Sequence, residues 1–196
     1  MTDDSSFDHR GLDLAARVAA HAHSDHYRKE TDIPYISHPF SVAMILAKLD
    51  VPDEALIAAM LHDTVEDTDL TIEDVREQFG DAVADIVAAC SEPIRELPWE
   101  KRKEGTIAKI KEAPLPVRWV VAADKLHNLR SIGREFQAVG DRVWNRFSRP
   151  RAKQEWYYRN VLRSLGEGEV DARLRLLLQW LAAEVTNVFG PEDAPG

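Results

Sequence analysis

The chain has 196 residues, of which 44% are hydrophobic, so it is long enough and apolar enough for one globular domain. Its 25 basic and 34 acidic residues give a formal net charge of −9, which argues against a nucleic-acid or membrane partner. The single cysteine, Cys90, excludes an internal disulfide and a zinc site built from several cysteines. The polar, acidic N-terminus lacks a secretion signal, and no apolar run could cross a bilayer. We therefore expect a cytoplasmic protein.

Helical periodicity covers the first half of the chain, without the alternation typical of strands. A Thr71…Asp74 capping pair and Gly80 mark the start and end of one of these helices. Arg28 and Lys29 are predicted to close the first helix. The helices predicted here cover residues 9–28, 38–49, 53–66, 71–80 and 81–91.

The second half of the chain is also predicted to be helical. A polar connection, SEPIRELPWEKRKEG, leads into a basic helix that runs to Lys111, and Pro114 and Pro116 precede a strongly apolar helix. The remaining helices are predicted at 117–132, 151–165 and 169–189, with a looser region around Gly140. We predict an all-α fold with one helical-bundle domain over residues 1–190 and a frayed tail over 191–196.

The stretch AAMLHDTVEDTDL places four ionisable side chains at the end of the most apolar helix, in positions 62, 63, 66 and 67. If the helix continues, four-residue spacing places His62 on the same face as Glu66, and Asp63 on the same face as Asp67. The residues alone are compatible with a solvated helix end. They are equally compatible with a metal site, since a cation offsets the cost of burying carboxylates and three acids oppose the helix dipole.

Two other segments place ionisable residues next to apolar stripes. Asp124 continues the stripe of Val117, Val120 and Val121, and Asn128 follows one turn later. A buried acid there pairs with a base or binds a cation. His38 starts a helix in PYISHPF, where a histidine serves as a cap, a packed side chain or a ligand.

Together these segments resemble the hydrolase domain of the RelA/SpoT family, within the HD phosphohydrolase superfamily, and most of all its stand-alone, Mesh-type small alarmone hydrolases. The motifs occur in order as RK, YISHP, MLHDTVEDT, FGDAV and ADKLHNLRS, from about residue 15 to residue 165. The resemblance implies one divalent metal ion, usually Mn²⁺, although other divalent transition metals are compatible with it. The implied ligands are His38, His62, Asp63 and Asp124.

The resemblance also implies roles for five further residues. Glu66 and Asp67 match a catalytic pair that acts on the attacking water. Arg28, Lys29 and Asn128 match positions that contact the nucleotide substrate. Other basic residues are candidates for phosphate contacts, although a solvated surface is the commoner role for each outer one. These are Lys101–Lys103, Lys125, Arg130, Arg149, Arg151 and Lys153.

The implied reaction removes the 3′-pyrophosphate from guanosine tetra- or pentaphosphate, which gives GDP or GTP and pyrophosphate. The alternatives are hydrolysis of another nucleotide, such as an adenosine alarmone, NADPH or a nucleoside monophosphate, and a catalytically silent nucleotide-binding regulator. A 196-residue chain leaves no room for an alarmone synthetase domain, so we expect hydrolysis only.

Three departures from the family pattern bear on substrate choice. The loop ETDI lacks the glycine that the family often has near the nucleobase, and AACSEPI replaces its usual VT stretch. In VWNRFSRPRAKQEWYYRN, aromatic residues either pack in the core or stack on a base, and Tyr157 or Tyr158 is the candidate to face the cleft.

The C-terminal leucines at 174, 177, 178 and 181 either pack internally or form a homodimer interface.

Overall fold

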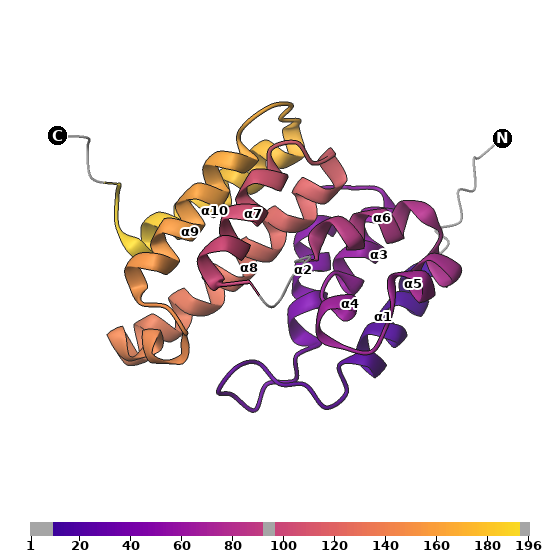
Figure 1. Ribbon diagram of the computed structural model, residues 1–196, viewed down its shortest axis with the longest axis horizontal. Helices are drawn as coiled ribbons and strands as arrows, with labels where there is room; N and C mark the ends of the chain where they lie inside the picture. The colour runs from indigo at the N-terminus through magenta and orange to yellow at the C-terminus, as the bar shows by residue number, and fades with distance from the viewer. Residues whose placement is uncertain (1–9, 92–96, 193–196) are drawn as a thin grey trace.

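The computed structural model describes residues 10–91 and 97–192, and its regular structure is helical apart from one isolated bridge between Tyr27 and Pro34 (Figure 1). The prediction of an all-α fold is therefore confirmed. The first half contains α1 (Arg10–Ala22), α2 (Ser37–Ala47), α3 (Asp53–Leu61), α4 (Thr64–Asp67), α5 (Ile72–Phe79) and α6 (Asp81–Cys90). The second half contains α7 (Trp99–Ile110), α8 (Leu115–Val139), the 3₁₀ helix η1 (Gly140–Arg146), α9 (Arg151–Leu165) and α10 (Ala172–Phe189).

Helix α8 connects the two halves of the molecule (Figure 1). It packs against α2, α3 and α6 on the N-terminal side and against α9, α10 and η1 on the other. Leu174, Leu177 and Leu181 of α10 are fully buried, and α10 packs along α8. Three of the four C-terminal leucines therefore pack internally, which is the first of the two roles considered for them.

The first helix is shorter than predicted, because α1 ends at Ala22 and not near residue 28. The chain then forms a loop in which the Arg28 amide donates to the Ile33 carbonyl, with Glu30 at a φ of 59°. The Tyr35 amide closes this loop by donating to the His26 carbonyl. Arg28 and Lys29 therefore lie in a loop, and the prediction that they end a helix was wrong.

The third helix also ends early, at Leu61, so the predicted helix through residue 66 was wrong. The Thr64 hydroxyl donates to the Leu61 carbonyl at 2.7 Å, and its side chain is fully buried. This bond satisfies a carbonyl at the end of α3, and the one-turn helix α4 starts at Thr64. His62 and Asp63 lie in the turn between α3 and α4.

The other boundaries agree more closely with the sequence. Helix α5 starts at the predicted capping box of Thr71 and Asp74, and it stops at Gly80, whose φ is 85°. Helix α8 is longer than predicted and already includes Pro116 in its first turn, where proline is tolerated. The first nine residues, residues 92–96 of the predicted polar connection and residues 193–196 of the predicted tail lie outside the described residues.

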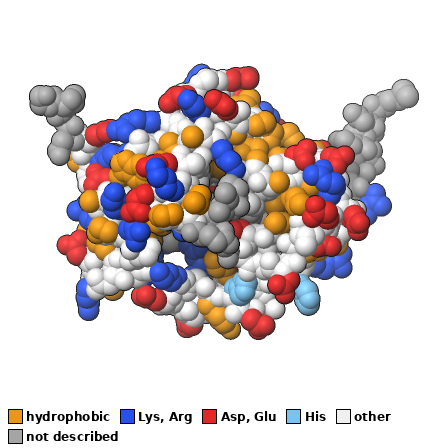
Figure 2. Space-filling model, in the orientation of Figure 1, with side chains coloured by type: hydrophobic (Ala, Val, Ile, Leu, Met, Phe, Trp, Pro, Cys, Tyr) orange, Lys and Arg blue, Asp and Glu red, His pale blue; other side chains and the backbone are white. Residues whose placement is uncertain are grey.

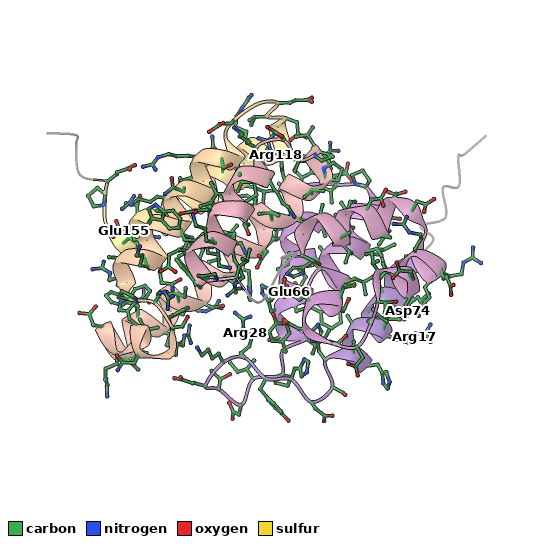
Figure 3. The ribbon with its side chains drawn as sticks, viewed as in Figure 1. Arg17, Arg28, Glu66, Asp74, Arg118 and Glu155 are labelled. Atoms are coloured by element: carbon green, nitrogen blue, oxygen red, sulfur yellow. The ribbon has the colours of Figure 1, made fainter. Side chains whose placement is uncertain are left out.

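One buried cation stabilises the C-terminal half. Arg118 of α8 is 2% exposed. It donates to the carbonyl of Leu165 at the end of α9 and to those of Glu167 and Glu169 in the α9–α10 connection. Figure 3 shows Arg118 near the top of the view, above Glu66 and Arg28. Among the described residues, no helix is long and apolar enough to cross a membrane.

Candidate metal centre and adjoining pocket

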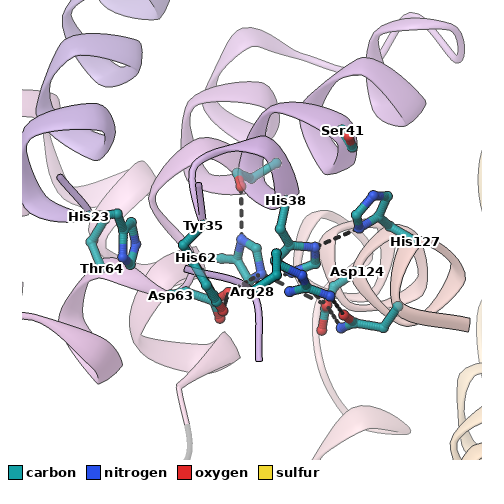
Figure 4. Close-up of polar contacts among 12 residues, drawn as sticks. His23, Arg28, Tyr35, His38, Ser41, His62, Asp63, Thr64, Asp124 and His127 are labelled. Carbon is teal, nitrogen blue, oxygen red and sulfur yellow. Dashed lines mark hydrogen bonds and ion pairs between the residues drawn. The ribbon is translucent and has the colours of Figure 1, made fainter. Parts of the chain in front are cut away.

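Two buried imidazoles converge where the two halves meet (Figure 4). His38 lies in the first turn of α2 and is 1% exposed, and His62 follows α3 and is 4% exposed. Their ring centroids are 5.2 Å apart. Nδ1 of His62 lies 2.8 Å from the Ala59 carbonyl and donates its proton there, so Nε2 is the nitrogen that can bind an ion once it is deprotonated.

Two carboxylates face these imidazole nitrogens. Oδ2 of Asp63 lies 3.2 Å from Nε2 of His62 and 3.5 Å from Nε2 of His38. Oδ1 of Asp124, on α8, lies 3.2 Å from Nε2 of His38 and 3.9 Å from that of His62. Three separate parts of the chain, α2, the α3–α4 turn and α8, thus bring two imidazoles and two carboxylates together.

The charges in this cluster depend on one another. Burial alone would raise the pKa of the Asp63 carboxyl, but the His62 imidazole holds it well below its usual range. Burial would likewise raise the pKa of Asp124, but Lys125 and His38 hold it low. Burial lowers the pKa of His38. Burial also opposes protonation of His62, but the combined attraction of Asp63, Asp124 and the Ala59 carbonyl raises its pKa to about 9. Both carboxylates are therefore anionic at neutral pH.

The donor set fits a divalent metal ion. Ligand atoms of His38, His62 and Asp124 all lie within 4.8 Å of one another, so they can hold one ion. Nε2 of His62 is buried and forms no hydrogen bond among the described residues, although Oδ2 of Asp63 lies 3.2 Å away, so an ion between the two groups would be its partner. Asp63 lies beside this group at the distances given above, and its ligation stays a prediction. Two imidazoles with carboxylates suit a borderline-hard transition metal.

Each carboxylate is also held by a neighbouring side chain. The Tyr35 hydroxyl donates to Oδ2 of Asp63 at 2.6 Å. Lys125 donates to Oδ2 of Asp124 at 2.6 Å, and the Asn128 amide donates to its Oδ1 at 2.5 Å. Such contacts fix the orientation of carboxylates that bind a metal.

Arg28 reaches this network from the α1–α2 loop. Its guanidinium donates to Oδ1 of Asn128 at 2.8 Å, and Asn128 in turn contacts Asp124 (Figure 4). A residue 100 positions away in the sequence is thereby held over α8. The loop after α1 therefore covers the site, although the sequence suggested the end of a helix.

The predicted catalytic pair lines the same small pocket as the ligand cluster. This pocket has a volume of about 200 Å³, and Glu66 and Asp67 of α4 lie in its wall with His62, Asp63 and Asp124. Figure 3 shows Glu66 near the centre of the molecule, between the two halves. Cys90 also lines the pocket, but burial raises the pKa of its thiol to about 12, so it stays neutral.

A larger pocket of about 860 Å³ adjoins the small one and shares part of its wall. The space-filling view is hollowed near the lower middle of this face, with Lys and Arg side chains at the edge of the hollow (Figure 2). The cationic residues that line the larger pocket are Arg28, Lys29, Lys103, Lys125, Arg134 and Arg146. Its aromatic lining residues are Tyr35, Trp99, Phe147, Tyr157 and Tyr158. Such a pocket suits an anionic ligand with a ring that can stack.

Some of the basic residues predicted as candidates for phosphate contacts line the pockets, whereas others pair with groups elsewhere. Lys103 and Lys125 line the pockets, and their ammonium groups lie 4.9 and 5.8 Å from the ring centre of Tyr157. The outer candidates Arg130 and Arg149 instead pair with Glu184 and Glu100. Lys101 pairs with Glu104, and Arg151 donates to the Val188 and Phe189 carbonyls.

The aromatic residues of the segment VWNRFSRPRAKQEWYYRN also divide between the two predicted roles. Trp144 is buried and stacks on Phe189 at 5.6 Å, so it belongs to the core. Tyr157 lines both pockets, whereas Tyr158 lines only the larger one. Of the two tyrosines, Tyr157 is therefore the one nearer the ligand cluster.

Sequence reasoning missed several lining residues of these pockets, among them Tyr35, His127, Arg134 and Arg146. Tyr35 and His127 lie inside the motifs YISHP and ADKLHNLRS, so their place in a motif was an available signal. Arg134 and Arg146 also line the larger pocket, one turn of helix and a 3₁₀ helix beyond the last motif, where no sequence pattern marks them.

Comparisons with known proteins agree with this geometry. The sequence profile of the HD domain family matches residues 15–151. Mouse (Mus musculus) guanosine-3′,5′-bis(diphosphate) 3′-pyrophosphohydrolase MESH1 is 39% identical over 123 residues, which cover 61% of this chain and 68% of the mouse protein. The Haemophilus influenzae protein of the same enzyme name is 37% identical over 122 residues, which cover 59% of this chain. That match spans only 18% of the Haemophilus protein, so the chain corresponds to a small part of it.

Solved structures show the same fold. The protein lmo0812 from Listeria monocytogenes EGD-e superposes with a TM-score of 0.74 at 35% identity, over 79% of this chain and 99% of that one. A metazoan orthologue of SpoT, described as hydrolysing ppGpp, superposes with a TM-score of 0.73 at 28% identity. That match covers 89% of this chain and 94% of the orthologue.

Proposed function

This chain belongs to the HD domain family, and from that premise we propose that it is a metal-dependent hydrolase that removes the 3′-pyrophosphate of guanosine alarmones. The products are GDP or GTP and pyrophosphate. The observation that carries the proposal is the junction of the two pockets, where a His/Asp cluster opens into a cavity lined by cations and aromatic rings. The naming of similar proteins as 3′-pyrophosphohydrolases supports the same substrate.

The ligands of the ion are His38, His62, Asp63 and Asp124, and we propose Mn²⁺ as the ion, because the mixed imidazole and carboxylate set suits it. A bound divalent ion supplies Lewis acidity for the phosphoryl group and for the attacking water. The proton of that water is accepted by Glu66, with Asp67 beside it, because both line the pocket that holds the ligand cluster.

The substrate phosphates are bound by cations on both sides of the ligand cluster. Lys125 and Lys103 line the pocket wall shared by the two cavities, and Arg28 and Lys29 approach from the loop after α1. Asn128 positions Arg28 and Asp124 together through its two hydrogen bonds. The nucleobase lies in the larger pocket, whose wall includes several aromatic rings.

The partner is thus a small-molecule nucleotide, and we propose a cytoplasmic location. The net charge of −9 supports the absence of nucleic-acid and membrane partners. Thr31 and Ile33 of the glycine-free loop line the larger pocket, so base preference depends on residues that differ from the family pattern.

The test is a panel of nucleotides incubated with purified protein and Mn²⁺, with separation of the products. We expect ppGpp to be consumed fastest, and Asp63→Ala to abolish turnover because it removes a carboxylate from the ligand cluster. Faster consumption of an adenosine alarmone, NADPH or a nucleoside monophosphate would replace the substrate that we propose. Inert protein with and without Mn²⁺ would favour a nucleotide-binding regulator.

A further inference from the structure

His127 lies behind the ligand cluster and contacts one of its imidazoles. Its Nδ1 lies 2.7 Å from Nδ1 of His38, and the two ring centroids are 4.9 Å apart at an interplanar angle of 33° (Figure 4). His127 is on α8, one turn after Asp124, so one helix supplies both a ligand and the contact to a second ligand.

The donor and acceptor roles in this contact follow from ligation. His38 faces the carboxylates with Nε2, so Nε2 is the nitrogen that binds an ion there. A neutral imidazole that ligates through Nε2 carries its proton on Nδ1. The His38 Nδ1–H must then donate, and the only atom that accepts it in the described contacts is Nδ1 of His127. His127 therefore presents a lone pair at Nδ1 and carries its own proton on Nε2.

The other ligands have comparable supports. The His62 Nδ1–H donates to the Ala59 carbonyl, and the Asp63 carboxylate accepts from Tyr35. A backbone carbonyl cannot change its acceptor role, whereas a histidine side chain can be replaced or turned. His38 is thus the ligand whose tautomer depends on a single side chain, and that side chain also lines the large pocket.

We propose that His127 is a positioning residue that fixes the tautomer and ring orientation of the metal ligand His38 by accepting its Nδ1–H. The proposal rests on the proposed metal site. An outer partner of a ligating histidine contributes about 10- to 100-fold in metal affinity. We expect that contribution from the hydrogen bond itself and not from the packing of the two rings.

The test compares two variants of similar volume. His127→Asn keeps an acceptor, because its amide oxygen takes the place of Nδ1, whereas His127→Leu removes the acceptor. Binding of Mn²⁺ is measured on purified protein through the electron paramagnetic resonance signal of free Mn²⁺, without any substrate. We expect His127→Leu to raise the dissociation constant about 10- to 100-fold, and His127→Asn to stay within about threefold of the wild type. His21→Leu, on the exposed surface of α1, is the matched control.

Two results would overturn the assignment. Equal losses in the Asn and Leu variants would show that only ring packing matters, and wild-type affinity in His127→Leu would show that His38 needs no partner. Thermal unfolding of the metal-free variants shows whether either change acts by unfolding the protein. A wild-type protein that binds no Mn²⁺ would instead contradict the proposed metal site, and with it this role, so the two failures are distinguishable.

Discussion

At the scale of single residues, a substitution of Glu66 is expected to reduce turnover without loss of the metal ion. Glu66 lines the small pocket, and we propose that it accepts a proton there and is not a fifth ligand of the ion. Glu66→Gln keeps the size and polarity of the side chain but removes its ability to accept a proton. Because general-base catalysis contributes about 10²- to 10⁴-fold, we expect kcat to fall at least about 100-fold with one Mn²⁺ still bound. Loss of the ion in Glu66→Gln would make Glu66 a ligand instead.

The raised pKa of His62 predicts how the stability of the metal-free protein depends on pH. The His62 imidazole has a pKa of about 9 in the folded protein, above the 6.5 of an unperturbed histidine. Its protonated form therefore stabilises the fold fully below pH 6.5, and this contribution is lost as the pH rises through 9. The pKa values of His38 and His127 are lowered, so these residues titrate below this interval.

We therefore expect the melting temperature of metal-free protein to fall between pH 6.5 and 9. The affinity for Mn²⁺ should rise over the same interval, because the proton on Nε2 of His62 competes with the ion. Calorimetry and Mn²⁺ titration at several pH values measure the two trends. A His62→Gln variant whose stability falls as steeply as that of the wild type would assign the effect to other groups.

The four proposed ligands and their neighbour Asn128 could be predicted from the sequence, whereas the contacts that Tyr35 and His127 make with the ligands could not. His38, His62, Asp63 and Asp124 stand out as ionisable residues beside apolar stripes, and the family motifs contain them all. His127 looks like an ordinary polar residue on a helix in sequence. Its role follows from a contact with His38, 89 positions away, which only the folded chain shows.

At the scale of elements, the break between α3 and α4 determines where Glu66 and Asp67, the predicted catalytic pair, lie. The apolar pattern predicted one helix to residue 66, because periodicity does not register a buried turn at His62 and Asp63. The Thr64 hydroxyl accounts for the break by satisfying the Leu61 carbonyl. The short helix α4 then carries Glu66 into the pocket wall.

Thr64→Val tests this account, because valine keeps the shape of the buried side chain and loses only the hydroxyl. We expect a loss of about 1 kcal/mol in the free energy of unfolding. Since small displacements of catalytic groups are costly, we also expect a drop in kcat of about tenfold or more. Thr186→Val removes a similar hydroxyl-to-carbonyl bond on α10, far from α4 in the sequence, and serves as the control. If both variants turn over at the wild-type rate, Thr64 does not position α4.

The loop after α1 is a second element that the sequence pattern did not predict. Basic residues at the end of an apolar helix predicted a helix terminus, but the Tyr27–Pro34 bridge turns this segment back on itself. This non-local pairing leaves no periodic signal in the sequence. Arg28 therefore reaches Asn128 from a loop, a geometry that follows from tertiary contacts alone.

At the scale of the whole molecule, the site lies where the two halves meet on α8 (Figure 1). The N-terminal half supplies two histidines and Asp63, and α8 supplies Asp124. The C-terminal half adds Tyr157 and Tyr158 to the wall of the large pocket. Neither half holds the complete site, so hydrolysis is expected to require the packing of both halves against α8.

The most direct test of the central claim is the identity and ratio of the products formed from ppGpp by the purified wild-type protein. With Mn²⁺ we predict GDP and pyrophosphate in equal amounts, and with EDTA in place of Mn²⁺ we predict unchanged ppGpp. Release of orthophosphate instead of pyrophosphate, or the same turnover in EDTA as in Mn²⁺, would contradict a metal-dependent 3′-pyrophosphohydrolase.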